Sequence, residues 1–287
     1  SMVHLLHRFE GVTRATGKVR VLDYTLSIFT NRAIGGGKIM NKKLILIVSL
    51  LAAPMLANAQ DDAPDVYSYV TYYYCDVATQ GNMDSVVEAY EKPVFDQWVE
   101  DGKLMSWGYF SHFTGGRWRR LQYHVSDSME GALNVQASIF SEIYSDNREG
   151  GQARGQACEA HDDYVWVSTL GSPADSDSGN VSLSVYYVCD IADEQRADEI
   201  FEEIYAPRLE AARESGDLAS WGWMSHRIGG KYRRLQTMLG ADHGSVNAAR
   251  LQIVREANQA DGALAREFAG ICHSHTDYLW DIIHETP

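Results

Sequence analysis

The sequence holds little positive charge, few cysteines and few prolines. Lysine and arginine number 25 against 39 acidic residues, which gives a formal net charge of −14 over 287 residues. This balance argues against binding to nucleic acid or to anionic membrane surfaces, because both interactions require basic patches. Hydrophobic residues make up 45% and charged residues 22%, the composition of a globular chain that can bury a substantial core.

Several motifs that carry well-defined chemistry are missing. The chain has no G-x-S-x-G nucleophile elbow, no P-loop and no G-x-G-x-x-G turn after a strand. The C-x-x-C-H motif for covalent haem attachment is also missing, so only noncovalent haem stays open as a cofactor. The four cysteines are far apart in sequence, which gives no support to zinc ribbons or C-x-x-C redox sites, and we predict no metal site.

The longest apolar run is short and has the flanks of a signal peptide. Lys42 and Lys43 precede the run Leu44–Leu56, which ends at the small-x-small site Ala57-Asn58-Ala59. A membrane-spanning helix needs about 20 apolar residues, more than this run supplies. We therefore predict a signal peptide over 40–59 and a mature protein that is periplasmic or secreted, with no membrane segment.

Residues 1–39 precede this predicted signal peptide, where no folded structure is expected. Gly35-Gly36-Gly37-Lys38-Ile39 comes directly before Met40. The segment Gly-Gly-Lys-Ile can be encoded by a purine-rich ribosome-binding sequence. We therefore predict that 1–39 is mistranslated upstream leader, which a gene without such a stretch would contradict.

The rest of the chain is one unit written twice. Cys189 follows Cys75 by 114 residues, and Cys272 follows Cys158 by the same spacing. The same offset maps Trp107 onto Trp221, His112 onto His226, Arg119-Arg120 onto Arg233-Arg234, and Trp166 onto Trp280. We place the repeats over 66–170 and 181–284, joined by a polar linker over 171–180. The two repeats are expected to pair within one chain.

Each repeat is predicted to fold as strand, helix, two strands, helix and strand. In the first repeat the strands cover 67–77, 104–114, 117–125 and 161–168, and the helices cover 84–100 and 131–147. Gly115-Gly116 joins the two middle strands as a hairpin turn. This order is the ferredoxin-like βαββαβ plan, so the predicted fold class is α+β, with two tandem ferredoxin-like domains.

The cysteines of an exported chain are expected to form disulfides. Four cysteines allow three full pairings. In the ferredoxin-like plan the last strand lies antiparallel beside the first, so the end of the first strand meets the start of the last. This topology selects Cys75–Cys158 and Cys189–Cys272, and each bridge is expected to stabilise its domain by about 2–4 kcal/mol.

Both repeats carry the hairpin L-x-S-W-G-x-x-S-H-x-x-G-G-x-x-R-R-L-Q after a long first helix. Two such units in tandem resemble the dimeric α+β barrel superfamily. The resemblance covers essentially all of 66–284 and implies two sheets packed face to face as a pseudo-dimeric barrel. Members of that superfamily include cofactor-independent monooxygenases, haem-binding and haem-degrading enzymes, chlorite dismutase-like proteins, isomerases and modules without known activity, so the resemblance does not select a reaction.

His112 and His226 are the candidate catalytic residues. On an alternating strand, Gly108, Phe110 and His112 point one way while Trp107 and Tyr109 point the other. A histidine inside the barrel can act as a general base, a proton donor or a haem ligand. The alternative is a buried neutral histidine that only makes a hydrogen bond across the sheet.

Other residues shared by the repeats are candidate ligand-binding residues. An inward arginine suits a carboxylate or a haem propionate, while the alternative for each arginine is a salt bridge to a nearby acid. A histidine and an aspartate two residues apart on the last strand can form an acid–base pair, or a hydrogen-bonded pair near the surface. The tryptophans are candidates for a ligand platform or for the core. These candidates are Trp107, Arg119, Arg120, His161, Asp163, Trp221, Arg233, Arg234, His275 and Asp277.

The function predicted from the sequence is therefore an exported protein that binds a small molecule inside an α+β barrel. Whether it is an enzyme stays open. The alternatives are a monooxygenase-like or isomerase-like enzyme that uses His112 and His226, and a protein that binds haem noncovalently. No cofactor is required by the sequence.

Overall fold

Eight antiparallel strands form one closed barrel. The computed structural model describes residues 65–172 and 179–286, so the leader predicted over 1–39 and the signal peptide predicted over 40–59 lie outside the described residues. The first half contributes β1 (Tyr67–Cys75), β2 (Ser106–Gly115), β3 (Arg120–Ser126) and β4 (Cys158–Gly171). The second half contributes β5 (Val181–Val188), β6 (Ser220–Ile228), β7 (Arg234–Gly240) and β8 (Ser274–Glu285). Around the barrel the order is β1-β3-β2-β8-β5-β7-β6-β4.

The predicted arrangement of two ferredoxin-like domains with separate, facing sheets is wrong. Strand β2 pairs with β8, with Phe110 opposite Ile282, and β4 pairs with β6, with Val167 opposite Ser225. These two ladders join the halves edge to edge into one sheet that closes on itself. Separate sheets would leave the backbone N–H and C=O groups of their outer strands unpaired, and pairing the two halves edge to edge satisfies these groups.

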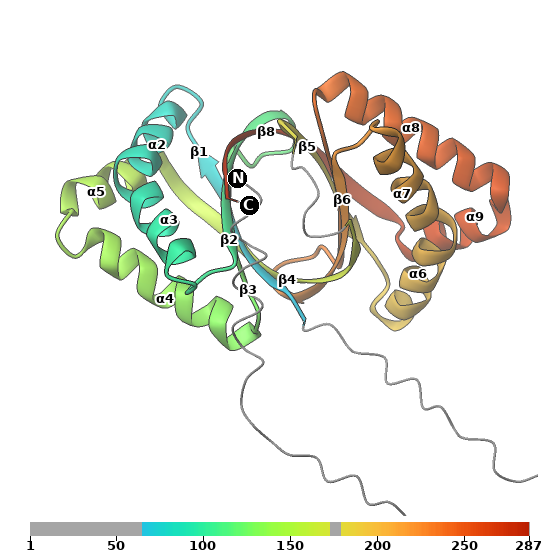
Figure 1. Cartoon of the computed structure of the whole chain (residues 1–287), viewed down its shortest axis with the longest axis horizontal. Helices are drawn as coiled ribbons and strands as arrows, with labels where there is room; N and C mark the ends of the chain where they lie inside the picture. The colour runs from blue at the N-terminus through green and yellow to red at the C-terminus, as the bar shows by residue number, and fades with distance from the viewer. Residues whose placement is uncertain (1–64, 173–178, 287) are drawn as a thin grey trace, which may run out of the picture. The chain divides into compact units, whose positions relative to one another are not determined.

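Helices cover the outside of the barrel on two sides (Figure 1). Beside the first half lie α2 (Gln80–Val86), the π-helical turn η1 (Val87–Glu91), α3 (Lys92–Glu100), α4 (Met129–Tyr144) and α5 (Arg148–Ala157). Beside the second half lie η2 (Ile191–Asp193), α6 (Glu194–Ile200), η3 (Phe201–Tyr205), α7 (Ala206–Ser215), α8 (His243–Ala260) and α9 (Gly262–Ile271). Within the described ranges, no helix is both long and apolar enough to cross a membrane.

Local sequence explains where these helices begin and end. Pro93 and Pro207 are the second residues of α3 and α7, which directly follow the π-helical turns η1 and η3, and a proline has no N–H to continue the helical hydrogen-bond pattern there. The side chains of Ser128 and Asp242 accept hydrogen bonds from backbone N–H groups and so cap α4 and α8. Gly216 ends α7 with a φ of +84°, a conformation that glycine adopts without strain.

The alternation of the strands divides the side chains between three cores. Trp107 and Tyr109 pack outward against the first-half helices, while Phe110 packs inside the barrel, as the predicted alternation requires. A matching cluster around Trp223 lies under the second-half helices. Because the barrel is closed, every inward residue must either fill its interior or border a cavity.

The structure contains both predicted disulfides. Cys75–Cys158 joins the end of β1 to the start of β4, and Cys189–Cys272 joins the corresponding positions of the second half. Each closes a loop of 83 residues. In each half the disulfide fixes the two neighbouring strands at the end of their ladder.

The first half buries a charged network that the second half replaces with aromatic packing. Glu91 has no exposed side-chain surface, and the Arg154 guanidinium lies 3.0 Å from its carboxylate. Gln122 and Tyr144 also donate hydrogen bonds to this carboxylate. At the positions of Glu91 and Arg154 the second half has Tyr205 and Phe268, whose ring centres are 5.1 Å apart.

Arg154→Ala should therefore lower the free energy of unfolding by about 3–5 kcal/mol, because Glu91 would stay buried without its countercharge. Urea denaturation measures this loss. The matched control is Arg196→Ala, whose ion pair with Glu267 is 2.7 Å long but exposed; it should cost less than about 1 kcal/mol. Equal losses of unfolding free energy in Arg154→Ala and Arg196→Ala would contradict the prediction that the buried ion pair stabilises the fold more than the exposed one.

Candidate functional site

Aromatic side chains fill one end of the barrel interior. The ring of Trp118 stacks on Tyr72 with centroids 4.1 Å apart and on Tyr278 at 5.0 Å. The aromatic cluster consists of Tyr72, Trp118, Tyr164, Trp166, Tyr186, Tyr232, Tyr278 and Trp280. Trp118 and Tyr232 enter it from the loops before β3 and β7, so the filled end is the one toward these hairpins.

Toward the other end the barrel holds a cavity of about 250 Å³. The cavity exists because inward positions become smaller along the strands: β5 presents Ser182, Ser184 and then Tyr186, and β1 presents Ser68 before Tyr72. The other lining residues are Val66, Val70, Ser106, Phe110, Leu121, Tyr123, Val125, Ser168, Met224, Leu235, Thr237, Leu239 and Glu285. The wall is therefore mostly apolar with a few hydroxyl groups, the usual character of a small-molecule site.

Tyr72 and Tyr186 form the boundary between the aromatic cluster and the cavity. Tyr72 and Tyr186 both line the cavity, and the oxygen of each hydroxyl is buried without a hydrogen-bond partner of ordinary geometry. Burial raises the pKa of Tyr72 well above its ordinary value, and the neighbouring Tyr186 adds to the effect. Burial raises the pKa of Tyr186 as well, so both phenols stay protonated.

The cavity also contains one carboxylate, that of Glu285. The Tyr123 hydroxyl donates a short hydrogen bond to Glu285 Oε1. Burial raises the pKa of Tyr123 well above its ordinary value, and the Glu285 carboxylate raises it further. Tyr123 therefore stays a hydrogen-bond donor, and Glu285 has one carboxylate oxygen left over.

The predicted catalytic histidines lie on the barrel side of their strands, outside the lining of the cavity. The His112 ring packs edge-on against Trp280 of β8 with centroids 6.0 Å apart, and His226 packs against Trp166 of β4 at 5.9 Å. Neither ring nitrogen of His112 makes a hydrogen bond of ordinary geometry. Both histidines therefore contact the aromatic cluster.

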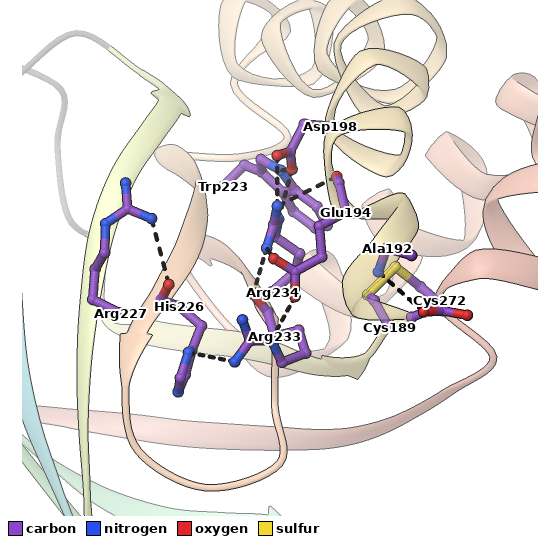
Figure 2. Close-up of polar contacts among 11 residues, drawn as sticks. Cys189, Ala192, Glu194, Asp198, Trp223, His226, Arg227, Arg233, Arg234 and Cys272 are labelled. Atoms are coloured by element: carbon purple, nitrogen blue, oxygen red, sulfur yellow. Dashed lines mark hydrogen bonds and ion pairs between the residues drawn. A yellow bond between two sulfur atoms is a disulfide. The ribbon is translucent and has the colours of Figure 1, made fainter.

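The predicted arginines lie outside the cavity lining, in ion pairs that attach β3 and β7 to helices. Arg120 is 5% exposed and binds the Asp84 carboxylate of α2 at 2.6 and 2.7 Å. Arg234 binds Asp198 of α6 in the same bidentate way, at 2.6 Å to each oxygen, as Figure 2 shows. These are the salt bridges weighed as alternatives to a ligand site, and they leave little of either guanidinium free.

The neighbouring arginines differ between the halves. Arg233 donates to Glu194 and lies 2.7 Å from Nδ1 of His226, so it connects the helix to the histidine (Figure 2). Arg119 instead donates to Gln80, an uncharged residue, at 3.3 Å. The second half thus has the carboxylate of Glu194 at the position where the first half has the uncharged amide of Gln80.

The remaining predicted site residues lie on the outer side of the barrel. Trp107 and Trp221 are buried against helices, where their indole N–H groups donate to Asp96 and Glu210.

The pairs on the last strands are likewise outside the cavity. His161 lies 3.3 Å from Asp163, and His275 lies 2.6 Å from Asp277, which also accepts from Arg250. Among the described residues, no three His, Cys, Asp or Glu side chains come together as metal ligands.

Comparisons with known proteins support the fold. No family model and no curated protein matches the sequence. The structure of a putative monooxygenase from Fusobacterium nucleatum superposes with a TM-score of 0.52 at 8% identity, covering 78% of this chain and 94% of that one. An anthrone oxidase-like protein gives 0.50 at 10% identity, covering 78% and 94%. A mutant chlorite dismutase from Candidatus Nitrospira defluvii gives 0.50 at 11% identity, covering 77% and 92%.

The chain therefore shares an α+β barrel fold with these proteins. At these identities the likeness concerns the fold alone and assigns no reaction. The superfamily resemblance leaves haem open, but this cavity does not fit it. No histidine lines the cavity, and about 250 Å³ is below the roughly 300–1,000 Å³ of common ligand pockets, whereas haem is a full tetrapyrrole macrocycle.

The residues that line the cavity were missed by the sequence reasoning. The inward series Ser182, Ser184 and Tyr186 carries a readable signal, because small residues followed by large ones on one face of a barrel strand leave space at one end. Glu285 lies one residue beyond the predicted end of the second repeat at residue 284. Tyr123 has Thr237 at the corresponding position, so comparison of the repeats hides it.

Stability should depend on the protonation of His112 and His226. Burial lowers the pKa of both, and the nearby Arg119 and Arg233 guanidinium groups lower it further. The unfolded chain, with histidine pKa values of about 6.5, therefore binds protons that the folded chain does not. Their contribution to stability is present above that pH and is lost as the pH falls below it.

The double variant His112→Gln/His226→Gln should accordingly lose less unfolding free energy than the natural chain between pH 7 and pH 5. Urea denaturation at a series of pH values measures both slopes. Both proteins contain the same carboxylates, so the difference between their two pH slopes comes from the two imidazoles. Identical slopes would contradict the lowered pKa values.

Proposed function

We propose that the chain is an exported protein that binds a small, mostly apolar molecule inside the barrel. The observation that carries the proposal is the cavity of about 250 Å³, whose wall is mostly apolar with a few hydroxyl groups. A largely apolar cavity with a few polar groups on its wall is the usual form of a small-molecule site. A cavity of about 150 Å³ holds benzene, so this one has room for a ring with a short polar side chain.

Export is proposed from the signal peptide predicted over 40–59, with two disulfides in support. Structural disulfides are typical of proteins that fold in an oxidising compartment. The repeats over 66–170 and 181–284 would then form the mature protein, paired with each other. N-terminal sequencing of the exported protein checks the cleavage and should begin at Gln60.

The enzyme alternative has less support in the residues that were chosen for it. His112 and His226 contact the aromatic cluster and do not line the cavity. The arginines selected with them are held by carboxylates on the helices. Any chemistry in the cavity would have to use the groups that line it, of which Glu285 and the tyrosines can exchange protons.

A ligand that fits should be displaced when the cavity is filled. In calorimetric titration 2-phenylethanol should bind the natural chain, and at 100 times its dissociation constant it should raise the unfolding free energy by about 2.7 kcal/mol. Ser184→Leu extends a larger side chain into the cavity and should abolish both effects. Ser68→Leu repeats the test from the opposite strand.

The matched control is Ser215→Leu, which makes the same change at an exposed position at the end of α7. It should bind as the natural chain does. The unfolding transition of each variant shows whether it folds. Unchanged binding in folded Ser184→Leu and Ser68→Leu would place the ligand outside the barrel and overturn the proposal.

A further inference from the structure

Glu285 is a carboxylate that lacks a countercharge inside the cavity. Its Oε1 accepts from Tyr123, while Oε2 is buried and has no hydrogen-bond partner. No lysine, arginine or histidine lines the cavity, and none forms an ion pair with Glu285 within the described residues. Glu285 Oε2 is therefore an unused acceptor beside the cavity, and a positive charge or a strong hydrogen-bond donor is the group that suits it.

The end of β8 is held in place so that Glu285 faces inward. The neighbouring Thr286 exchanges two hydrogen bonds with the backbone of Trp107: its N–H donates to the carbonyl at 2.9 Å, and its Oγ1 accepts from the Trp107 N–H at 2.8 Å. On the other side, His284 lies 2.8 Å from Glu88. The position of the carboxylate is therefore determined by strand pairing on β2.

Gly108 makes the Tyr123–Glu285 contact sterically feasible. A Cβ atom at Gly108 would lie 2.4 Å from the ring of Tyr123, so any other residue would displace that ring. Glu285 pairs with Gly108 across the β2–β8 ladder. The absence of a side chain on Gly108 thus lets the phenol cross the strand and reach the acid.

This arrangement exists in one half of the barrel only. The positions that correspond to Tyr123 and Glu285 are Thr237 and Gly171. The cavity is therefore polarised, with its single acid on the β2–β8 side and neutral groups on the β4–β6 side. Phe110 packs edge-on against Tyr123 with centroids 5.7 Å apart, so aromatic rings lie beside the acid.

We propose that the ligand is an organic primary amine, bound as its ammonium ion. This inference rests on the proposed binding function. The ammonium group donates to Glu285 Oε2 and supplies the missing charge, while neighbouring aromatic rings stabilise the cation further. The apolar body of the amine lies among the aliphatic wall residues Met224, Leu235 and Leu239. A neutral alcohol of the same shape can fill the cavity but cannot neutralise the acid.

Calorimetric titration with 2-phenylethylamine and 2-phenylethanol tests this proposal, because the two probes differ only in the polar group. The amine should bind the natural chain at least about tenfold more tightly than the alcohol, the worth of one hydrogen bond between charged groups. Glu285→Gln keeps the shape of the side chain and should remove this preference, so that the two probes bind with equal affinity.

Glu130→Gln is the matched control, since it removes one negative charge at an exposed position at the start of α4. It should keep the natural preference for the amine, which separates a local effect from the overall negative charge. Equal affinity of the two probes for the natural chain would overturn the amine proposal but leave the binding function standing. Absence of binding by either probe would count against the binding function itself.

Discussion

Closure of the barrel by the pairing of β2 with β8 and of β4 with β6 is the constraint on which the rest of the structure depends. It leaves no free strand edge in the described sheet, and it fixes alternate residues of every strand as interior or exterior. The size of the inward side chains then decides whether the interior is filled or contains a cavity. Large aromatic residues fill one end, and serines at the inward positions of β1 and β5 leave the other end hollow.

The exterior is held by a different kind of interaction. Arg120–Asp84 and Arg234–Asp198 connect β3 and β7 to the helices that follow β1 and β5. Their bidentate geometry fixes direction as well as distance, which suits contacts that orient a helix on a sheet. Both halves need these contacts, and this explains why the arginines recur at a spacing of 114 residues without touching the cavity.

The sequence predicted the alternation around Trp107, the order of the strands, and the disulfides Cys75–Cys158 and Cys189–Cys272, because these depend on local periodicity and on adjacent strands. It did not predict the separate helices α5 and α9 before the last strand of each half. It did not predict closure, since pairing between distant strand edges leaves no local signal. Recurrence in both repeats selected structural residues such as Arg120. The cavity's own polar residues differ between the halves, as Tyr123 and Thr237 show, so recurrence could not find them.

A crystal of the chain pressurised with xenon tests the hollow barrel most directly, because xenon enters apolar cavities without needing any particular polar group. Xenon should occupy the space bordered by Tyr72, Tyr186 and Met224. Its position would establish that the serines of β1 and β5 leave an accessible cavity. A barrel whose side chains fill that space, with no xenon inside, would contradict the central claim that this end of the barrel is hollow.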